Sequence, residues 1–198
     1  MRTALVTGAS RGIGRGIAES LARQGYGLTI TSRNAEDLVT LAAHLEELGA
    51  ARVVHRAADM ADRDALPGLV DLHGTTYGAM SALVINAGVG TAGPVAEFPL
   101  RRIDKTLAVN LGSAVVLIQS ALPLLRTGAE QDPDHGATIV GLSSITGVYA
   151  EPGLAVYGAS KAGLISLLNT VNLEESGRGV KATAVAPGYV DTDMSAWV

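Results

Sequence analysis

The sequence of 198 residues contains no cysteine. This absence excludes disulfide bonds and every metal site that needs thiolate ligands, and it is typical of a reducing compartment, so we expect a cytoplasmic protein. Histidine offers no substitute ligand set, because the four histidines have no partner four residues away and no acids gathered beside them. We therefore expect no metal site. The histidines are His44, His55, His73 and His135.

The chain also lacks an excess of positive charge and a long uninterrupted apolar run. Its net charge is -4, with acids spread along the sequence, so nucleic acid would find no basic patch. The first apolar run is too short for a signal peptide. The most apolar later segment, 107–125, is interrupted by Asn110, Gln119 and Pro123, which predicts a core or interface helix and no membrane span.

What the chain does contain is an alternation of strand and helix patterns. Apolar stretches of strand length predict strands at 3–7, 27–32, 52–57, 82–85, 137–142 and 180–186. Helical patterns lie between them, at 14–23, 35–48, 62–77 and 99–126 (in one or two pieces), and a further helix contains Tyr157 and ends at about 175. An irregular acidic turn is expected at 128–136. At least five such alternations favour an α/β fold, a doubly wound parallel sheet flanked by helices, in one domain spanning 1–198.

A glycine-rich loop follows the first predicted strand and opens the first helix. Gly8 would turn the chain, Gly12 would let the backbone approach a pyrophosphate, and Gly14 would let the helix pack close to the sheet. A plain turn is the alternative reading. The position between strand and helix favours a dinucleotide site. The predicted cofactor contacts in this loop are Gly8, Ser10, Arg11, Gly12, Ile13 and Gly14.

The end of the second predicted strand bears on cofactor choice. An NAD site usually has an acid here to bind the ribose hydroxyls, but this chain has Ser32 and Arg33. Arg33, together with Arg11, is suited to a 2′-phosphate through charge-assisted hydrogen bonds. NADP(H) is therefore the expected cofactor, unless both arginines are only solvated surface residues.

Other candidates stand just past the predicted strand ends. Asp59, followed by Met60, either accepts a hydrogen bond from adenine or is a plain loop aspartate. The small residues of Asn86-Ala87-Gly88 imply close packing against the central strand or a cofactor. Asn110 interrupts an apolar helix face and should have a hydrogen-bond partner. Pro187 and Gly188 close the last predicted strand.

Tyr157 and Lys161 are the main candidates for chemistry. They are four residues apart in a helical pattern, so their side chains share a face. Tyrosine titrates with a pKa near 10, and one nearby cation lowers a pKa by about 1 to 3 units, so Lys161 would need help from a second positive charge such as an oxidised nicotinamide. Ser144 follows a predicted buried strand, where open α/β sheets bind their ligands. Without Ser144, the pair would read as an ordinary surface tyrosine and lysine.

These motifs together resemble the short-chain dehydrogenase/reductase family, in order and over nearly the whole chain. The matching positions are Thr7-Gly8, Gly12, Gly14, Asp59, Asn86-Ala87-Gly88, Asn110, Ser144, Tyr157, Lys161, Pro187-Gly188 and Thr192. The resemblance implies a Rossmann-type fold in which Tyr157 is the acid/base and Ser144 binds the substrate oxygen. It implies that Lys161, which also binds the nicotinamide ribose, lowers the pKa of Tyr157. Asn110 would hold a water molecule that links Lys161 to solvent. The resemblance also implies cofactor contacts from Pro187, Gly188, Val190 and Thr192.

The resemblance predicts an NADP(H)-dependent oxidoreductase that acts on a small carbonyl or alcohol substrate. The alternatives are an NADP(H)-binding sensor or scaffold without turnover and, less compatible with so short a chain, a lyase or epimerase. The apolar residues of 107–125 and 164–173 predict a homodimer or homotetramer.

Relatives with this pattern usually continue past Pro-Gly-x-Val-x-Thr with a substrate lid, another helix and a final strand. Here the sequence ends at Val198, soon after Thr192. We therefore expect a longer native chain and, in these residues, an open apolar sheet edge at 181–186.

Overall fold

The structure is a computed structural model that describes residues 1–190. The strands are β1 (Thr3–Thr7), β2 (Gly27–Thr31), β3 (Arg52–His55), β4 (Ala82–Ile85), β5 (Ala137–Leu142) and β6 (Val180–Val185). The α-helices are α1 (Gly12–Arg23), α2 (Ala35–Glu47), α3 (Pro67–Tyr77), α4 (Leu100–Leu107), α5 (Ser113–Gln131) and α6 (Ala155–Glu175). Single helical turns are η1 (Val95–Glu97), the π-helical η2 (Ala108–Gly112), η3 (Ile145–Gly147) and η4 (Ser176–Arg178).

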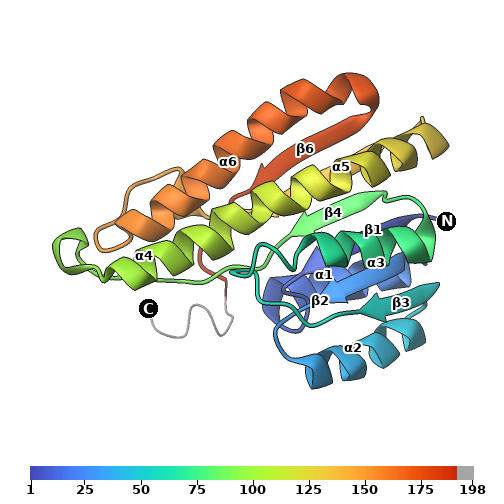
Figure 1. The fold of residues 1–198 in the computed structure, drawn as a ribbon, viewed down its shortest axis with the longest axis horizontal. Helices are drawn as coiled ribbons and strands as arrows, with labels where there is room; N and C mark the ends of the chain where they lie inside the picture. The colour runs from blue at the N-terminus through green and yellow to red at the C-terminus, as the bar shows by residue number, and fades with distance from the viewer. Residues whose placement is uncertain (191–198) are drawn as a thin grey trace.

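All six strands are parallel and form one sheet in the order β3-β2-β1-β4-β5-β6 (Figure 1). Leu5 at the centre of β1 is paired with Thr29 of β2 on one side and Leu83 of β4 on the other. The direction of winding reverses between β1 and β4, which is where open α/β sheets bind ligands at the carboxyl ends of their strands. The predicted doubly wound, Rossmann-type sheet is confirmed.

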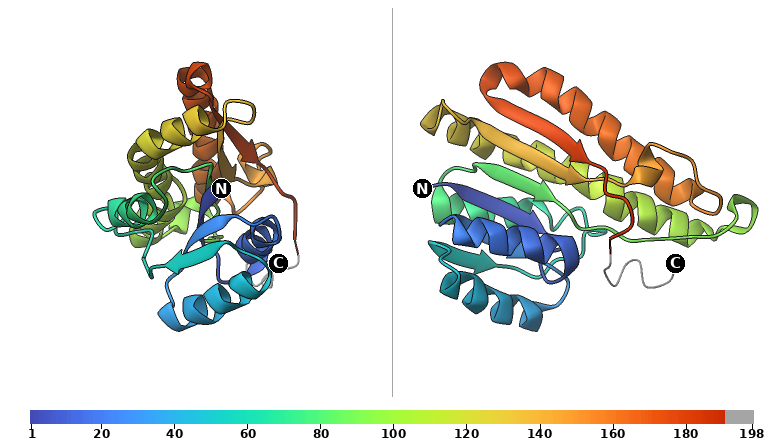
Figure 2. Two further views of the ribbon diagram at one scale, coloured as in Figure 1. Left: turned by 90° about the vertical axis from the view of Figure 1, so that its right-hand side faces the viewer. Right: turned by 180° about the vertical axis from the view of Figure 1, so that it is seen from behind.

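Each face of the sheet has its own apolar core. Ala4, Val6 and Leu28 face α1 and α2, whereas alternate strand residues such as Leu5 and Leu83 face α3, α5 and α6. Figure 2 shows α1 and α2 on the face turned to the viewer in its right-hand panel. Both faces of the central strands are thus covered, which accounts for their nearly continuous apolar sequences.

The third helix begins later than predicted, at Pro67 in place of Asp62. The preceding residues form turns because Asp59 Oδ1 accepts a hydrogen bond from the Ala61 N–H at 2.9 Å, and the Asp62 N–H donates to the Asp59 carbonyl at 3.0 Å. Proline is favoured in a first helical turn, where its missing N–H costs nothing. The prediction was wrong because local side-chain hydrogen bonds compete with the helix.

The long apolar helical segment consists of α4 and α5 joined by the π-helical turn η2, and it extends beyond its predicted end at Arg126 to Gln131. Gly128 was expected to begin the turn, but it lies inside α5 against the Met80 backbone, where a side chain would not fit. By length and composition alone, Leu100–Gln131 could cross a membrane. Its residues Leu117 and Leu125 are nevertheless fully buried in the core, as the prediction of a core helix requires.

Strand β6 has β5 as its one neighbour among the described residues. Its side chains alternate: Val180 and Ala182 are buried, whereas Lys181 and Thr183 are exposed. The expected open edge is therefore present within residues 1–190, but it is only partly apolar. Helix α6 packs on one face of β6, and on the other face Val185, which is 45% exposed, stands beside Lys181 and Thr183.

Candidate active site

Asn86 joins the end of β4 to the glycine loop that follows β1. Its Nδ2 donates to the carbonyl oxygens of Thr7 at 2.9 Å and Gly8 at 3.0 Å. The Thr7 hydroxyl accepts from the backbone N–H groups of Asn86 and Ala87, each at 3.0 Å. Gly8 has φ of 63°, and a Cβ there would lie 2.8 Å from Asn86 Nδ2. The predicted close packing of this segment is against the central strand and its loop.

The N-terminus of α1 lies in this glycine loop. Arg11 is the N-cap residue, no side chain within residues 1–190 caps the first turn, and Gly12 has φ of 55°. The first turn also contains no acid. Uncapped N–H groups and the positive end of the helix dipole favour an anion at this position. This loop therefore fits the pyrophosphate that the sequence predicts for it.

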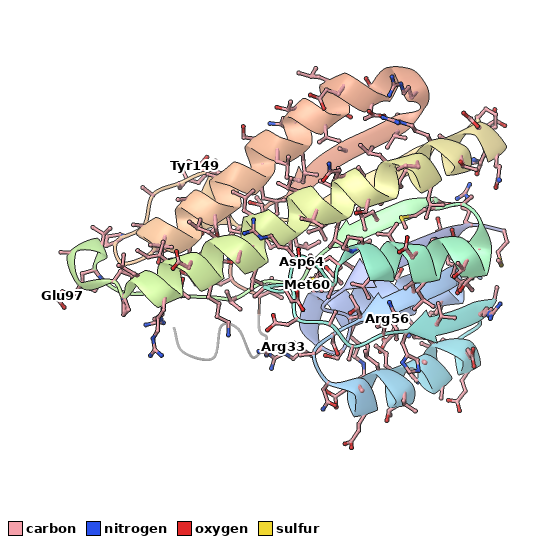
Figure 3. All side chains as sticks on the ribbon, viewed as in Figure 1. Arg33, Arg56, Met60, Asp64, Glu97 and Tyr149 are labelled. Atoms are coloured by element: carbon pink, nitrogen blue, oxygen red, sulfur yellow. The ribbon has the colours of Figure 1, made fainter. Side chains whose placement is uncertain are left out.

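After the end of β2, the side chains of Ser32 and Asn34 form hydrogen bonds at the start of α2. Ser32 Oγ donates to the Asn34 carbonyl at 3.2 Å, and Asn34 Oδ1 accepts from the Glu36 N–H at 2.9 Å. Arg33 between them is exposed and forms no ion pair within residues 1–190 (Figure 3). Its guanidinium is thus available to an anion, as the predicted 2′-phosphate contact requires.

Asp59 and Met60 lie in the loop after β3. One Asp59 carboxylate oxygen closes a turn by accepting from the Ala61 N–H, which explains an aspartate here without any ligand. The Met60 side chain is buried in the core, with 6% of its surface exposed. Any cofactor contact of Met60 would therefore involve its backbone, and the adenine contact of Asp59 stays a prediction.

Ser144 and Tyr157 come together at the carboxyl ends of the central strands. Ser144 is the N-cap of η3, and its Oγ accepts from the Thr146 N–H at 3.3 Å and lies 3.0 Å from the Thr146 hydroxyl. Tyr157 lies in the first turn of α6. Burial raises the pKa of Tyr157, and a hydrogen bond with Ser144 partly offsets this effect. The phenol is therefore protonated at neutral pH.

Lys161 lies one turn further along α6 and is only 5% exposed. Its Nζ is 5.8 Å from the centre of the Tyr157 ring and donates to the Leu142 carbonyl, at the end of β5, at 2.6 Å. Burial lowers the pKa of Lys161 to about 8. A cation therefore lies beside the phenol at neutral pH, but in this structure burial outweighs it and the pKa of Tyr157 stays raised.

Asn110 occupies the π-helical turn η2 and is 2% exposed. Its Oδ1 accepts from the Val89 N–H at 2.8 Å, and its Nδ2 donates to the Val89 carbonyl at 3.1 Å and to Ser160 Oγ at 3.0 Å. The expected partner of this buried amide is thus the loop after β4. Both N–H bonds of Nδ2 are used, so a water held by Asn110 would have to bind elsewhere on the residue, and that role stays a prediction.

The loop after β6 reaches the Ser144 loop, since the Pro187 carbonyl accepts from the Ile145 N–H at 2.9 Å. Pro187 and Gly188 therefore lie near the predicted catalytic serine, and Val190 is 41% exposed. Thr192, the last predicted cofactor contact, lies outside the described residues.

Two serines that the sequence did not single out hold the turn of α6 that contains Tyr157 and Lys161. Ser143 Oγ donates to the Lys161 carbonyl at 2.9 Å, and Ser160 Oγ donates to the Tyr157 carbonyl at 2.6 Å. Both serines are at most 6% exposed. The sequence offered one indication of their role, namely that they are adjacent to Ser144 and Lys161. It does not show which side of the strand or helix each hydroxyl faces, and therefore whether it is buried.

Comparisons with known proteins cover the whole site. A family model described as short chain dehydrogenase matches residues 2–198. Among curated proteins, a 3-oxoacyl-[acyl-carrier-protein] reductase FabG of Staphylococcus aureus is 35% identical over 199 residues, which is 98% of this chain and 76% of the relative. A D-beta-hydroxybutyrate dehydrogenase of Rhizobium meliloti is 31% identical over 194 residues, covering 98% of this chain and 73% of the relative.

Two solved structures are similar over 98% of this chain. A short chain dehydrogenase from Burkholderia cenocepacia in complex with NADP has a TM-score of 0.88 and 36% identity, with 76% of its chain covered. The Pseudomonas aeruginosa RhlG/NADP active-site complex has a TM-score of 0.90 and 31% identity, with 75% covered. The chain thus spans about three quarters of these relatives.

Proposed function

The chain belongs to the short-chain dehydrogenase family of oxidoreductases, and from this premise we propose that it transfers a hydride between NADP(H) and a carbonyl or secondary alcohol. The observation that carries the proposal is the juxtaposition of Ser144, Tyr157 and Lys161 at the carboxyl ends of β5 and the central strands. The NADP complexes of two similar structures support the choice of cofactor.

Tyr157 is the proposed proton donor in the reductive direction. Its raised pKa keeps the phenol protonated at neutral pH, so its O–H can give a proton to a carbonyl oxygen. Ser144 would donate a hydrogen bond to the same oxygen and stabilise the negative charge that develops there. The proximity of the two side chains supports this assignment, because both hydroxyls can then reach one substrate oxygen.

Lys161 is the proposed electrostatic partner of Tyr157. With a pKa of about 8 it is mostly protonated at neutral pH, and its charge favours the phenolate that remains after proton transfer. Its second proposed role is to bind the nicotinamide ribose. Lys161 carries three N–H donors, of which one is used by Leu142, so two remain for ribose hydroxyls. Asn110 holds the Val89 loop against this group.

The cofactor would supply the hydride and, in its oxidised form, a further positive charge near the phenol. The uncapped start of α1 would bind its pyrophosphate, and Arg33 with Arg11 would favour the 2′-phosphate of NADP(H) over NAD(H). The other proposed contacts are Gly8, Ser10, Gly12, Ile13, Gly14, Asp59, Met60, Asn86, Ala87, Gly88, Pro187, Gly188, Val190 and Thr192.

We further propose that the protein is a homodimer or homotetramer. Large apolar side chains are exposed on the long helices: Leu107 is 39%, Val115 46% and Leu173 81% exposed. Apolar surface on adjoining helices is typical of a subunit interface. Light scattering at micromolar concentration should give a mass above that of the 20.2 kDa monomer.

A substrate panel tests the activity. The protein is mixed with NADPH and, in turn, simple ketones, a 3-oxo acid and 3-oxoacyl thioesters, and the loss of reduced-nicotinamide absorbance is followed. At least one carbonyl compound should be reduced with catalytic turnover. Tight NADPH binding without turnover on any of them would instead identify a sensor or scaffold.

A further inference from the structure

A cavity of about 210 Å³ lies between the loop after β4 and the helix α4, beside the proposed catalytic group and not within it. One wall is formed by three consecutive loop residues, and the other by residues of α4. The lining residues are Val89, Gly90, Thr91, Arg102, Lys105 and Thr106.

Two cations border this cavity. Arg102 and Lys105 are one helical turn apart, and neither forms an ion pair within residues 1–190. The Arg102 guanidinium carbon is 5.2 Å from the centre of the Phe98 ring. Stacking of this kind orients a guanidinium while leaving its N–H groups available to an acceptor. The neighbouring acid on the helix, Asp104, pairs with neither cation in the described part of the chain.

The loop wall adds unused hydrogen-bond donors. The backbone N–H groups of Gly90 and Thr91 donate no hydrogen bond to any residue in 1–190, although Thr91 is only 9% exposed. Buried N–H groups without partners are rare and costly. The Thr91 hydroxyl does not serve as their acceptor. It lies 3.2 Å from the Thr106 hydroxyl, which itself donates to the Arg102 carbonyl. Consecutive free N–H groups form a concave binding site for anions.

The loop is held in place by the proposed active site. Asn110 binds both the N–H and the carbonyl of Val89, the first lining residue. Gly88, just before it, lies so close to Lys161 that a Cβ there would be 3.5 Å from Nζ. The cavity and the catalytic group therefore share one stretch of backbone.

We propose that this cavity is an anion site that binds a phosphate or carboxylate group. The space is large enough for either group and is lined by two cationic residues and by two adjacent loop residues with unused N–H donors, and no acid in the described residues neutralises the cations. The site does not depend on hydride transfer, since it is built from groups outside the proposed catalytic set. The anion could belong to the substrate or to the cofactor.

Isothermal titration with inorganic phosphate tests the proposal, at constant ionic strength and with or without saturating NADP⁺. The double variant Arg102→Gln/Lys105→Gln is compared with the unmodified protein and with Arg101→Gln, which removes a cation from the same helix outside the cavity. All three side chains are exposed, so the fold should persist, as circular dichroism would verify. The double variant should bind phosphate at least about fivefold more weakly, and Arg101→Gln should bind it as the unmodified protein does.

The NADP⁺ arm identifies the source of the anion. Phosphate binding that persists beside NADP⁺ assigns the site to the substrate. Phosphate binding that NADP⁺ abolishes, with weaker NADP⁺ binding by the double variant, assigns it to the cofactor. The proposal is overturned if the double variant binds phosphate as tightly as the unmodified protein, or if Arg101→Gln weakens binding equally. Neither result depends on turnover, so the proposed hydride transfer stands or falls separately.

Discussion

The two ends of the sheet each bury a basic side chain, His73 at the amino end and Lys161 at the carboxyl end. His73 is fully buried, and burial lowers its pKa to about 4. Its Nε2 lies 3.1 Å from the Ala79 carbonyl, which can only accept, so Nε2 carries the proton and Nδ1 accepts from the Thr29 hydroxyl at 2.8 Å. Both ring nitrogens are thus satisfied.

Lys161 is also buried, yet its three donors make only one hydrogen bond to residues 1–190. Its neighbour Gly88 has no side chain to fill the space beside Nζ. Burial therefore has different consequences at the two ends: at the amino end it produces an inert neutral base, and at the carboxyl end a cation with unused donors. Unused donors, more than a shifted pKa, distinguish the proposed functional group from the structural one.

Among the variants that test this comparison of the two ends, Lys161→Met is expected to have the largest effect on turnover. Turnover should fall at least about a hundredfold, because the phenolate of Tyr157 loses its cation. The free energy of unfolding at pH 7 should not fall, because the substitution removes a buried charge. Turnover assays and urea unfolding would check both. A loss of stability above about 1 kcal/mol would show that Lys161 has a structural role after all.

The converse variant, His73→Leu, should destabilise the fold without impairing the active site. The Thr29 hydroxyl and the Ala79 carbonyl would lose a partner, at a cost of about 2 kcal/mol. Turnover per folded molecule should stay within about twofold of the unmodified protein. Urea unfolding combined with steady-state assays measures both. A large drop in turnover with little change in stability would show that His73 has a functional role and not a structural one.

The pH dependence of stability should reflect the same histidine. Its folded pKa of about 4 lies below the ordinary 6.5, so the unfolded chain binds the proton first and stability falls as pH drops from 6.5 towards 4. Between pH 7 and pH 5 this loss amounts to about 2 kcal/mol. His73→Leu should lack that component in unfolding experiments at the two pH values. Equal losses in both proteins would show that other groups are responsible.

The smallest predicted effect concerns Arg33, the proposed contact of the cofactor 2′-phosphate at the carboxyl end of β2. NADPH should bind at least about tenfold more tightly than NADH, which is about 1.4 kcal/mol. Arg33→Gln should narrow that difference, whereas Arg23→Gln, an exposed arginine in the last turn of α1, should not. Fluorescence titration with both cofactors gives the dissociation constants. Equal constants in the unmodified protein would remove Arg33 from the cofactor site.

The sheet could be predicted from the sequence because its strands are short apolar runs between glycines and helical patterns. The end of α5 could not be predicted, because a glycine in this position usually ends a helix. Here Gly128 instead lets α5 approach the Met80 backbone. Likewise the hydrogen-bonded turn at Asp59 delays α3, which begins at Pro67. In each case a tertiary or side-chain contact outweighs the local pattern.

For the site, residue types and spacing were enough to nominate Ser144, Tyr157 and Lys161. They were not enough to predict the hydrogen bonds of Ser143 and Ser160, or that burial raises the pKa of Tyr157 despite the nearby cation. Such balances depend on how deeply each group is buried, which a single sequence does not specify.

The most direct test of the central claim, that the carboxyl end performs its chemistry through the Tyr157 proton, is the turnover of Tyr157→Phe with a reducible ketone at equal NADPH occupancy. The substitution removes one oxygen atom and leaves the ring in place. Turnover should fall at least about a hundredfold while the dissociation constant for NADPH stays nearly the same. More than a tenth of the original turnover would mean that the proton comes from another group.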